Sequence, residues 1–291
     1  MADFTQGHTN LKTHRGPDIR RLEVGGSLLY YLEQGTGIPV VLVHGSLGDY
    51  RSWRQQMGPF SERFRVIAYS RRYHYPGTWS GGQSDYSAAR HGDDLAGLIE
   101  SLNLGRPHIV ASSFGAYVSL LTAISHPDLV RSLVLGEPPA FPILNSHPDG
   151  AAYWNDFNVR AWTPARKAFD RGKDEDGVRH FLDGVLGQGS YDRLPPPARS
   201  MLLDNVPAMK AEHSSLDYLS ELTCGLVRTM HTPSLLVNGE LSPPMFHRIT
   251  DELERCLPNA ERIVVPATSH AIHNQNARFY NAAVLGFLEK H

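Results

Sequence analysis

The chain has 291 residues, and its 28 Lys or Arg against 30 Asp or Glu leave a formal net charge of −2. Because acidic and basic residues are interspersed, the sequence predicts no nucleic-acid surface and no binding to an anionic membrane. The N-terminal 21 residues are polar, and no apolar run approaches the ~20 residues of a membrane span. We expect one cytoplasmic α/β domain that acts on a small neutral or apolar molecule.

The cysteines and histidines indicate neither a disulfide framework nor a metal site. Cys224 and Cys256 are the only cysteines, which is too few for a disulfide framework, and they lack the spacing of a metal clip. We therefore expect buried thiols in a reducing compartment. The 15 histidines are scattered, without the H-x3-H or HExxH spacing of metal ligands. The sequence predicts no metal and no cofactor.

The first predicted elements form a hairpin, because residues 21–24 and 28–32 flank Gly25-Gly26, a pair typical of two-residue hairpin turns. Later strands are predicted from short apolar runs, which are typical of parallel strands buried on both faces. These runs cover residues 40–43, 65–69, 109–111, 133–135, 235–237 and 263–265. Helical periodicity appears over residues 95–102 and 280–288. The alternation predicts an α/β fold with a mostly parallel sheet covered by helices on both faces.

An insertion interrupts this alternation between Leu135 and Thr232. The interval is rich in aromatic residues, and the run 195–197 of three prolines breaks any single long helix. We expect residues 138–231 to form a helical lid over the carboxyl edge of the sheet, with 1–137 and 232–291 as the core domain. Aromatic residues in such a unit more often fill its own core than contact substrate. The candidates for substrate contact are Trp154, Phe157 and Trp162.

The most informative segment is HIVASSFGAY at residues 108–117, which predicts a strand, a sharp turn and a helix. In a nucleophile elbow the serine at the turn is flanked by small residues, because strand and helix nearly touch there. Ala111 and Gly115 are the small residues here, although the usual first glycine is replaced by alanine. Ser113 is therefore a candidate nucleophile, and its short pattern needs support from other motifs.

Further motifs follow other predicted strands: VHGSLG at 43–48, NGE at 238–240 and PATSH at 266–270. An open α/β sheet places its chemistry at the carboxyl ends of its strands. With these motifs and the elbow, the chain resembles the α/β-hydrolase fold family, in the branch of serine esterases and lactonases with a helical lid after the sixth strand. The resemblance extends from about Arg21 to the end of the chain.

The resemblance implies a role for each motif. Ser113 is the nucleophile and His270 the base that takes its proton, while His273 is a less favoured alternative base. The backbone amides of Ser46 and Phe114 form the oxyanion hole, with Leu47 as the alternative to Ser46. His44 is expected to be a structural residue.

The acid of the triad departs from the family pattern. Members commonly carry Asp in G-x-x-D after the penultimate strand, where this chain has Ser242. Glu137 follows the strand at 133–135 and stands before two prolines, and Glu240 lies beside the missing Asp. We favour Glu137, because the acid must reach the second nitrogen of the histidine.

The resemblance implies a serine hydrolase that cleaves an apolar ester or lactone through an acyl-enzyme, with a Ser-His-Glu triad. Two alternatives stay open: a carbon–carbon bond hydrolase of ring-cleavage products, although these usually carry Trp where Ala271 follows His270, and a non-catalytic relative that only binds a small ligand. The arginines of the loop at 70–77 either shape the pocket mouth or bond to carbonyl groups, and we favour the second. The sequence does not predict the oligomeric state.

Overall fold

The computed structural model describes residues 18–81, 85–215 and 219–291, and its centre is one eight-stranded sheet. The strand order is β1-β2-β4-β3-β5-β6-β7-β8, and the pairs from β4 onward are parallel. The strands are β1 (Arg20–Val24), β2 (Ser27–Gln34), β3 (Pro39–Val43), β4 (Arg65–Ser70), β5 (His108–Ser112), β6 (Ser132–Gly136), β7 (Ser234–Gly239) and β8 (Ala260–Val265). The predicted fold class is confirmed.

The N-terminal hairpin is also confirmed. Val24 of β1 pairs with Ser27 of β2, so Gly25 and Gly26 are the two turn residues. Their φ angles are +51° and +72°, which a type I′ turn requires and glycine adopts without steric cost. Strand β2 then pairs antiparallel with β4 and joins the hairpin to the parallel part of the sheet.

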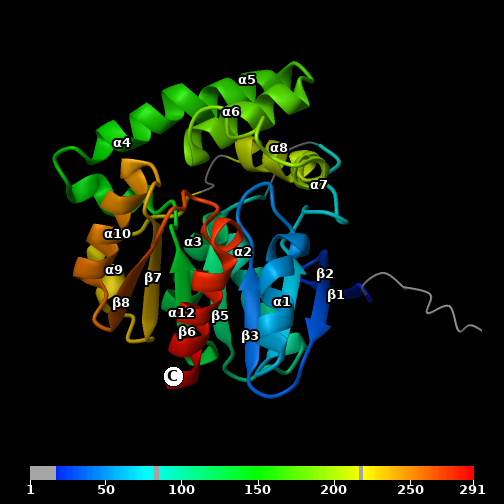
Figure 1. Cartoon of the computed structure of the whole chain (residues 1–291), viewed down its shortest axis with the longest axis vertical. Coiled ribbons are helices and arrows are strands. Elements are labelled where there is room, and N and C mark those ends of the chain that lie inside the picture. The colour runs from blue at the N-terminus through cyan, green and yellow to red at the C-terminus, as the bar shows by residue number, and fades with distance from the viewer. Residues whose placement is uncertain (1–17, 82–84, 216–218) are drawn as a thin grey trace, which may run out of the picture.

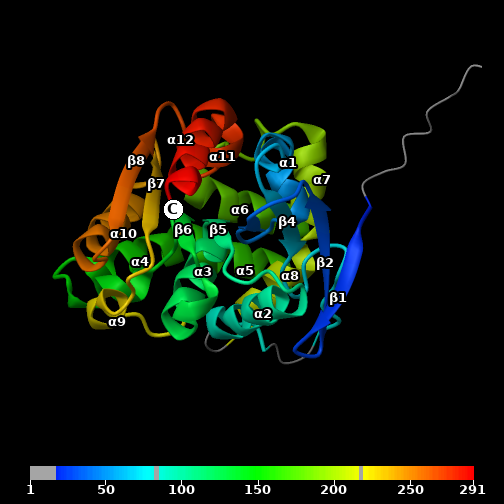
Figure 2. The same cartoon turned by 90° about the horizontal axis from the view of Figure 1, so that it is seen from below.

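Helices cover both faces of the sheet (Figure 2). Side chains alternate between the faces: Val41 and Val43 pack toward one layer, and Val40 and Leu42 toward the other. The first layer contains α2 (Ala88–Ser101), α3 (Phe114–Ser125) and α10 (Pro244–Cys256). The second contains α1 (Arg54–Ser61) and α12 (Ala277–Lys290), with the short η1 (Tyr50–Trp53) and α11 (Ile272–Gln275) nearby. A further short helix, η2 (Pro127–Leu129), leads into β6.

A helical insertion follows β6 and precedes β7. Figure 1 shows its longer helices lying together across one end of the sheet. Its elements are η3 (Phe141–Ser146), α4 (Gly150–Phe157), η4 (Asn158–Trp162), α5 (Thr163–Asp170), α6 (Asp174–Leu186), α7 (Pro196–Asp204), α8 (Val206–Ser214) and α9 (Cys224–Arg228). We call these elements the insertion. The division into a core domain and a lid at residues 138–231 stays a prediction.

Helix α3 packs directly onto the end of β3 at Gly115. A Cβ on this residue would lie 2.3 Å from the carbonyl oxygen of His44 and 2.5 Å from that of Val43. Both distances are far below van der Waals contact, and both oxygens belong to the backbone. Glycine is therefore required for helix and strand to approach this closely.

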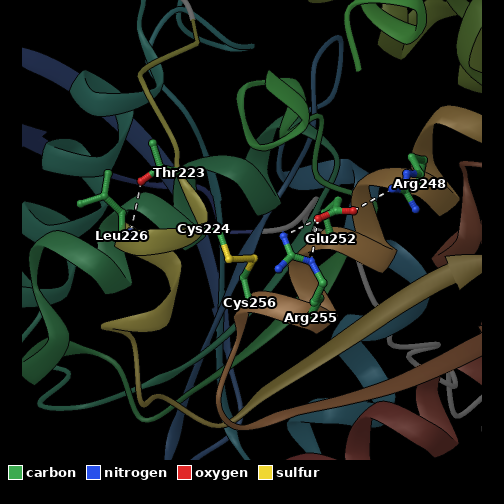
Figure 3. Close-up of a disulfide and its surroundings, with 7 residues drawn as sticks. All are labelled: Thr223, Cys224, Leu226, Arg248, Glu252, Arg255 and Cys256. Carbon is green, nitrogen blue, oxygen red and sulfur yellow. Dashed lines mark hydrogen bonds and ion pairs between the residues drawn. A yellow bond between two sulfur atoms is a disulfide. The ribbon is translucent and has the colours of Figure 1, made fainter. Parts of the chain in front are cut away.

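A disulfide joins Cys224 of α9 to Cys256 of α10, with a Cα–Cα distance of 5.3 Å (Figure 3). The prediction of two free thiols is therefore wrong. The pairing depends on α9 packing beside α10, and the 32-residue separation of the cysteines gives no local signal of it. The expectation of a reducing compartment loses its support. Within the described ranges, no helix combines the length and apolarity needed to cross a membrane.

Because both cysteines are joined in the disulfide, we expect the denatured protein to react with no thiol reagent unless it is first reduced. We expect Cys224→Ser to lower the free energy of unfolding by about 2–4 kcal/mol, because the crosslink restricts the unfolded chain. Urea unfolding and mass spectrometry after alkylation measure both effects. The double variant Cys224→Ser/Cys256→Ser has no thiols and is the control. Added reductant should lower the free energy of unfolding of the wild-type protein and leave that of the double variant unchanged. Two alkylated cysteines without reduction would contradict the bond.

The contact at Gly115 predicts that Gly115→Ala lowers the free energy of unfolding by about 3 kcal/mol, because the methyl group must displace helix or strand. Gly286→Ala is the matched control, since this exposed glycine lies inside α12 and a Cβ there meets nothing within 4 Å. The free energy of unfolding of this control should rise by about 0.5–1 kcal/mol, because alanine favours a helix more than glycine does. Urea unfolding compares the two variants, and equal stabilities would disprove the close contact.

Candidate active site

Ser113 stands at the sharp turn between β5 and α3. Its backbone has φ +54° and ψ −128°, a conformation that non-glycine residues rarely adopt. The turn is held by the amide of Ser113, which donates to the carbonyl of Gly136 at 2.7 Å. Ala111 lies inside β5, where extended backbone accepts an alanine in place of the family's glycine.

Three side chains form a continuous hydrogen-bonded row. His270 Nε2 lies 2.9 Å from Ser113 Oγ, and His270 Nδ1 lies 2.7 Å from Glu137 Oε2. Because an ionised carboxylate only accepts hydrogen bonds, Nδ1 carries the proton of a neutral His270 and Nε2 is left to accept from the serine. The imidazole is also stacked on Phe246, at 4.0 Å between ring centroids. This arrangement fixes the ring against the serine.

Glu137 follows β6 and is buried. Its Oε1 accepts from the amide of Gly239 at 2.8 Å and from the side chain of Asn238 at 3.3 Å. Burial by itself would raise the pKa of Glu137, but the hydrogen bond and charge of His270 and the hydrogen bond from the amide of Gly239, at the end of β7, outweigh it. The pKa is held below its usual value, so this carboxylate is ionised.

The two alternative candidates lie elsewhere. Glu240 is exposed, and its Oε2 accepts from the amide of Ala267 at 2.8 Å. His273 is buried with its ring stacked on Trp53, 4.4 Å between centroids, and burial lowers its pKa to about 4. Neither side chain is part of the row formed by Ser113, His270 and Glu137.

The turn at residues 44–48, where the sequence predicts part of an oxyanion hole and which we therefore call the oxyanion turn, lies against the serine. A Cβ on Gly45 would be 2.7 Å from that of Ser113. Arg71 holds the turn: its Nε donates to the carbonyl of His44 at 3.0 Å and its Nη2 to that of Gly45 at 3.1 Å. These bonds match the favoured expectation for the loop at 70–77. Burial and then the charge of Arg71 lower the pKa of His44 well below the usual 6.5, consistent with a structural role.

A cavity opens above Ser113, with walls from the core and the insertion. Phe157 and Trp162 are among the residues that line it, and their contact with substrate stays a prediction. Trp154 is not among the lining residues: its ring packs against Phe141 and Phe157, 5.1 and 6.1 Å between centroids, and its contact with substrate stays a prediction. The lining residues are Ser46, Ser113, Phe114, Pro139, Phe141, Phe157, Trp162, Phe181, Val185, Glu212, Met245 and Phe246. Ser46 is among them, and the alternative Leu47 is fully buried with φ +56°.

Glu212 of α8 is a polar residue of this cavity that the sequence analysis did not identify. Its Oε1 lies 3.1 Å from Ser46 Oγ, and its Oε2 accepts from Tyr86 Oη at 3.0 Å. These partners are 166 and 126 residues away in the sequence, so no local pattern could have indicated them. The sequence by itself shows only that a glutamate occurs within the insertion.

Comparisons with known proteins agree with this architecture. A family model described as the alpha/beta hydrolase fold matches residues 38–277. The chain is 26% identical over 283 residues to 2-(acetamidomethylene)succinate hydrolase of Mesorhizobium japonicum, covering 93% of this chain and 95% of that protein.

Two solved structures share the fold at lower identity. The enol-lactonase from Burkholderia xenovorans LB400 aligns with a TM-score of 0.73 and 18% identity, covering 93% of this chain and 100% of that one. A thermophilic esterase from Thermogutta terrifontis aligns with a TM-score of 0.73 and 22% identity, covering 93% and 98%. The family match extends over most of the sequence and includes the elbow and the oxyanion turn, and this chain belongs to the alpha/beta hydrolase fold family.

Proposed function

We propose that this protein is a serine hydrolase that cleaves a carboxylic ester or lactone through an acyl-enzyme. The observation that carries the proposal is the hydrogen-bonded row from Ser113 Oγ through His270 to Glu137, with distances of 2.9 and 2.7 Å. A serine hydroxyl is a weak nucleophile until a neighbouring base takes its proton, and this row supplies such a base. The hydrolytic activities named for the relative from Mesorhizobium japonicum and the two structural neighbours support a hydrolytic reaction here.

In the first half of the reaction, Ser113 Oγ attacks the substrate carbonyl carbon while His270 Nε2 takes the hydroxyl proton. The tetrahedral oxyanion accepts hydrogen bonds from the backbone amides of Ser46 and Phe114, each contributing about 3 kcal/mol. Phe114 begins helix α3, so the helix N-terminus adds a favourable dipole. When the carbon–oxygen bond to the alkoxide breaks, protonated His270 gives its proton to the leaving oxygen, which yields the acyl-enzyme.

In the second half, water attacks the acyl carbon and gives a proton to His270. The intermediate collapses, Ser113 regains its proton, and the carboxylic acid is released. In a lactone the leaving hydroxyl stays attached to the acyl group, so the product is one hydroxy acid. Glu137 stays ionised throughout and stabilises the imidazolium that forms twice in the cycle.

The cavity favours an apolar small-molecule substrate. Apart from Ser46, Ser113 and Glu212, its described lining consists of aromatic and aliphatic side chains. Such a wall gains free energy by removing apolar groups from water, at about 25 cal/mol per Å² buried. We propose that residues 138–231 act as a lid that supplies much of this wall through Phe157, Trp162 and Phe181. No cofactor enters this mechanism.

Ser113→Ala is expected to abolish ester turnover and covalent labelling by a fluorophosphonate. A rate about 10³-fold above that in water should remain, from the oxyanion hole and substrate binding alone. Steady-state kinetics with apolar aryl esters and mass spectrometry of the labelled protein measure both effects. Ser112→Ala, at the adjacent serine in β5, is the matched control and should still be labelled once. Normal labelling of Ser113→Ala would remove this residue from the mechanism.

Glu137→Gln is expected to lower kcat by about 10⁴-fold, because the amide keeps the side-chain volume but loses the charge that offsets the imidazolium. Glu240→Gln is the matched control, and its kcat should fall less than about tenfold because this carboxylate is exposed. Steady-state kinetics on the same ester compare the two variants. If Glu240→Gln were the more damaged enzyme, the acid would have to be placed after β7.

A further inference from the structure

Glu212 is a polar residue of the cavity to which the proposed mechanism gives no role. It belongs to α8 of the insertion, and only 2% of its surface is exposed. The cavity's other polar residues, Ser113 and Ser46, are respectively the proposed nucleophile and part of the oxyanion turn. Burying a carboxyl group in an apolar site is costly unless it is paired or neutral. Its position therefore needs a physical explanation.

The contacts of Glu212 lead to the oxyanion turn by two routes. One is direct: Ser46 Oγ donates to Oε1 at 3.1 Å. The other passes through Tyr86. Its Oη donates to Oε2 at 3.0 Å and accepts from Arg71 Nη1 at 3.0 Å. Arg71 in turn holds the carbonyl groups of the turn. A residue of the insertion thus contacts the same turn that presents the Ser46 amide to the substrate.

The surroundings favour a neutral carboxyl group. Glu212 forms no ion pair with any residue in the described ranges, because Arg71 directs its N–H groups to Tyr86 and to backbone carbonyls. Burial raises the pKa of Glu212 to about 7, although the charge of Arg71 and the hydrogen bonds from Tyr86 and Ser46 act in the opposite direction. A carboxylate here would also lie beside the place where the oxyanion develops, and the two negative charges would repel each other.

The proton on Glu212 decides where the Ser46 hydroxyl points. Arg71 donates to Tyr86 Oη, so the tyrosine proton is available to Oε2, and the carboxyl proton belongs on Oε1. When Glu212 is neutral with its proton on Oε1, the bond reverses: Oε1 donates to Ser46 Oγ, and the serine proton points away from the carboxyl group. An ionised Glu212 instead accepts the serine proton, and only lone pairs of Ser46 Oγ are left to face the cavity.

We propose that Glu212 is a positioning residue for the oxyanion hole: as a neutral carboxyl group it turns the Ser46 hydroxyl toward the reacting carbonyl oxygen. The hydroxyl then acts as a third donor beside the amides of Ser46 and Phe114. Ionisation of Glu212 withdraws this donor and adds a repelling charge. This inference rests on the proposed serine hydrolase function and adds a proton-dependent step to it. The enzyme should therefore lose activity on the alkaline side as Glu212 ionises.

The other charged and titratable groups around Glu212 keep one state across the neutral range. Behind Tyr86, burial and the charge of Arg71 lower the pKa of each of three histidines well below the usual 6.5: these are His44, His74 and His91. Burial raises the pKa of Tyr86 well above 10. On α8 itself, burial lowers the pKa of His213 to about 3, and Lys210 is paired with Asp174 at 2.7 Å.

The test compares kcat for an apolar aryl ester between about pH 6.5 and about pH 9. For the wild-type protein, kcat should fall about tenfold or more across this range, as expected for loss of one oxyanion donor. In Glu212→Gln the amide copies the neutral acid, donating to Ser46 and accepting from Tyr86, so its kcat should change less than about threefold over the same range. The matched control is Glu175→Gln at an exposed glutamate of α6, which should retain the wild-type fall.

Ser46→Ala separates the hydroxyl from the backbone amide. Its kcat near pH 6.5 should be about 10–100-fold below that of wild type, with KM within about threefold, because the lost interaction forms only in the transition state. Its alkaline fall should be smaller than that of wild type, because only the repelling charge of ionised Glu212 then acts on the oxyanion. A wild-type kcat that stays level to about pH 9, or a Glu212→Gln profile that falls like the wild type, overturns the proposal. A Ser46→Ala enzyme as fast as wild type overturns the role of the hydroxyl.

A second measurement does not depend on catalysis. Because the pKa of Glu212 in the folded protein is about 7 and its usual value is 4.5, the folded state holds this proton longer than the unfolded chain does. The stability that this proton gives is complete below the unfolded value and is lost as pH rises through the folded one. The free energy of unfolding of wild type minus that of Glu212→Gln should therefore fall between about pH 4.5 and about pH 7 and then level off.

Failure of the two proposals can be told apart. If the wild-type protein hydrolyses no ester or lactone, the proposed function fails, and the catalytic part of this inference fails with it. The unfolding comparison still reports whether Glu212 is neutral when buried. A difference in unfolding free energy that does not vary with pH would overturn the neutral carboxyl group even in an active hydrolase.

Discussion

The close approach of α3 to β3 at Gly115 is the constraint on which the site depends. Because a side chain there would meet the carbonyls of Val43 and His44, the helix can sit this low only on a glycine. That position leaves Ser113 at a sharp turn with φ +54° and brings it against Gly45. The proposed nucleophile and the oxyanion turn are thus held together by backbone packing. Such contacts change little with side-chain motion, which suits a site that must be formed before substrate arrives.

The acid depends on the same end of the sheet. Strands β5 and β6 are neighbours, and the amide of Ser113 donates to the carbonyl of Gly136, so Ser113 and Glu137 begin from adjoining strand ends. The amide of Gly239 at the end of β7 holds the carboxylate from the other side. A carboxylate after β6 can therefore reach His270 without the aspartate that other family members carry after β7. At that later position the chain has Ser242, which cannot supply a carboxylate.

The features predicted from the sequence are those with a local physical cause. Buried parallel strands give short apolar runs, the hairpin needs glycines at positive φ, and strand-to-turn motifs mark the carboxyl edge, so the fold and the residues Ser113, His270 and Glu137 could be proposed without coordinates. The disulfide and Glu212 could not, because each depends on helices of the insertion packing against distant parts of the core. For a related reason, composition places Trp154 in the insertion but does not determine which of the aromatic rings there face the cavity.

The insertion is joined to the core by buried polar contacts as well as by apolar packing. Asn205, between α7 and α8, donates to Asp49 Oδ2 at 2.6 Å and accepts from the amide of Tyr75 at 2.9 Å. Hydrogen bonds are directional, and leaving such groups buried without partners is costly, so these contacts determine how α8 lies on the core. Glu212 is seven residues further along and meets Ser46 because of that placement. Specific hydrogen bonds therefore determine where the polar side of the cavity lies relative to Ser46.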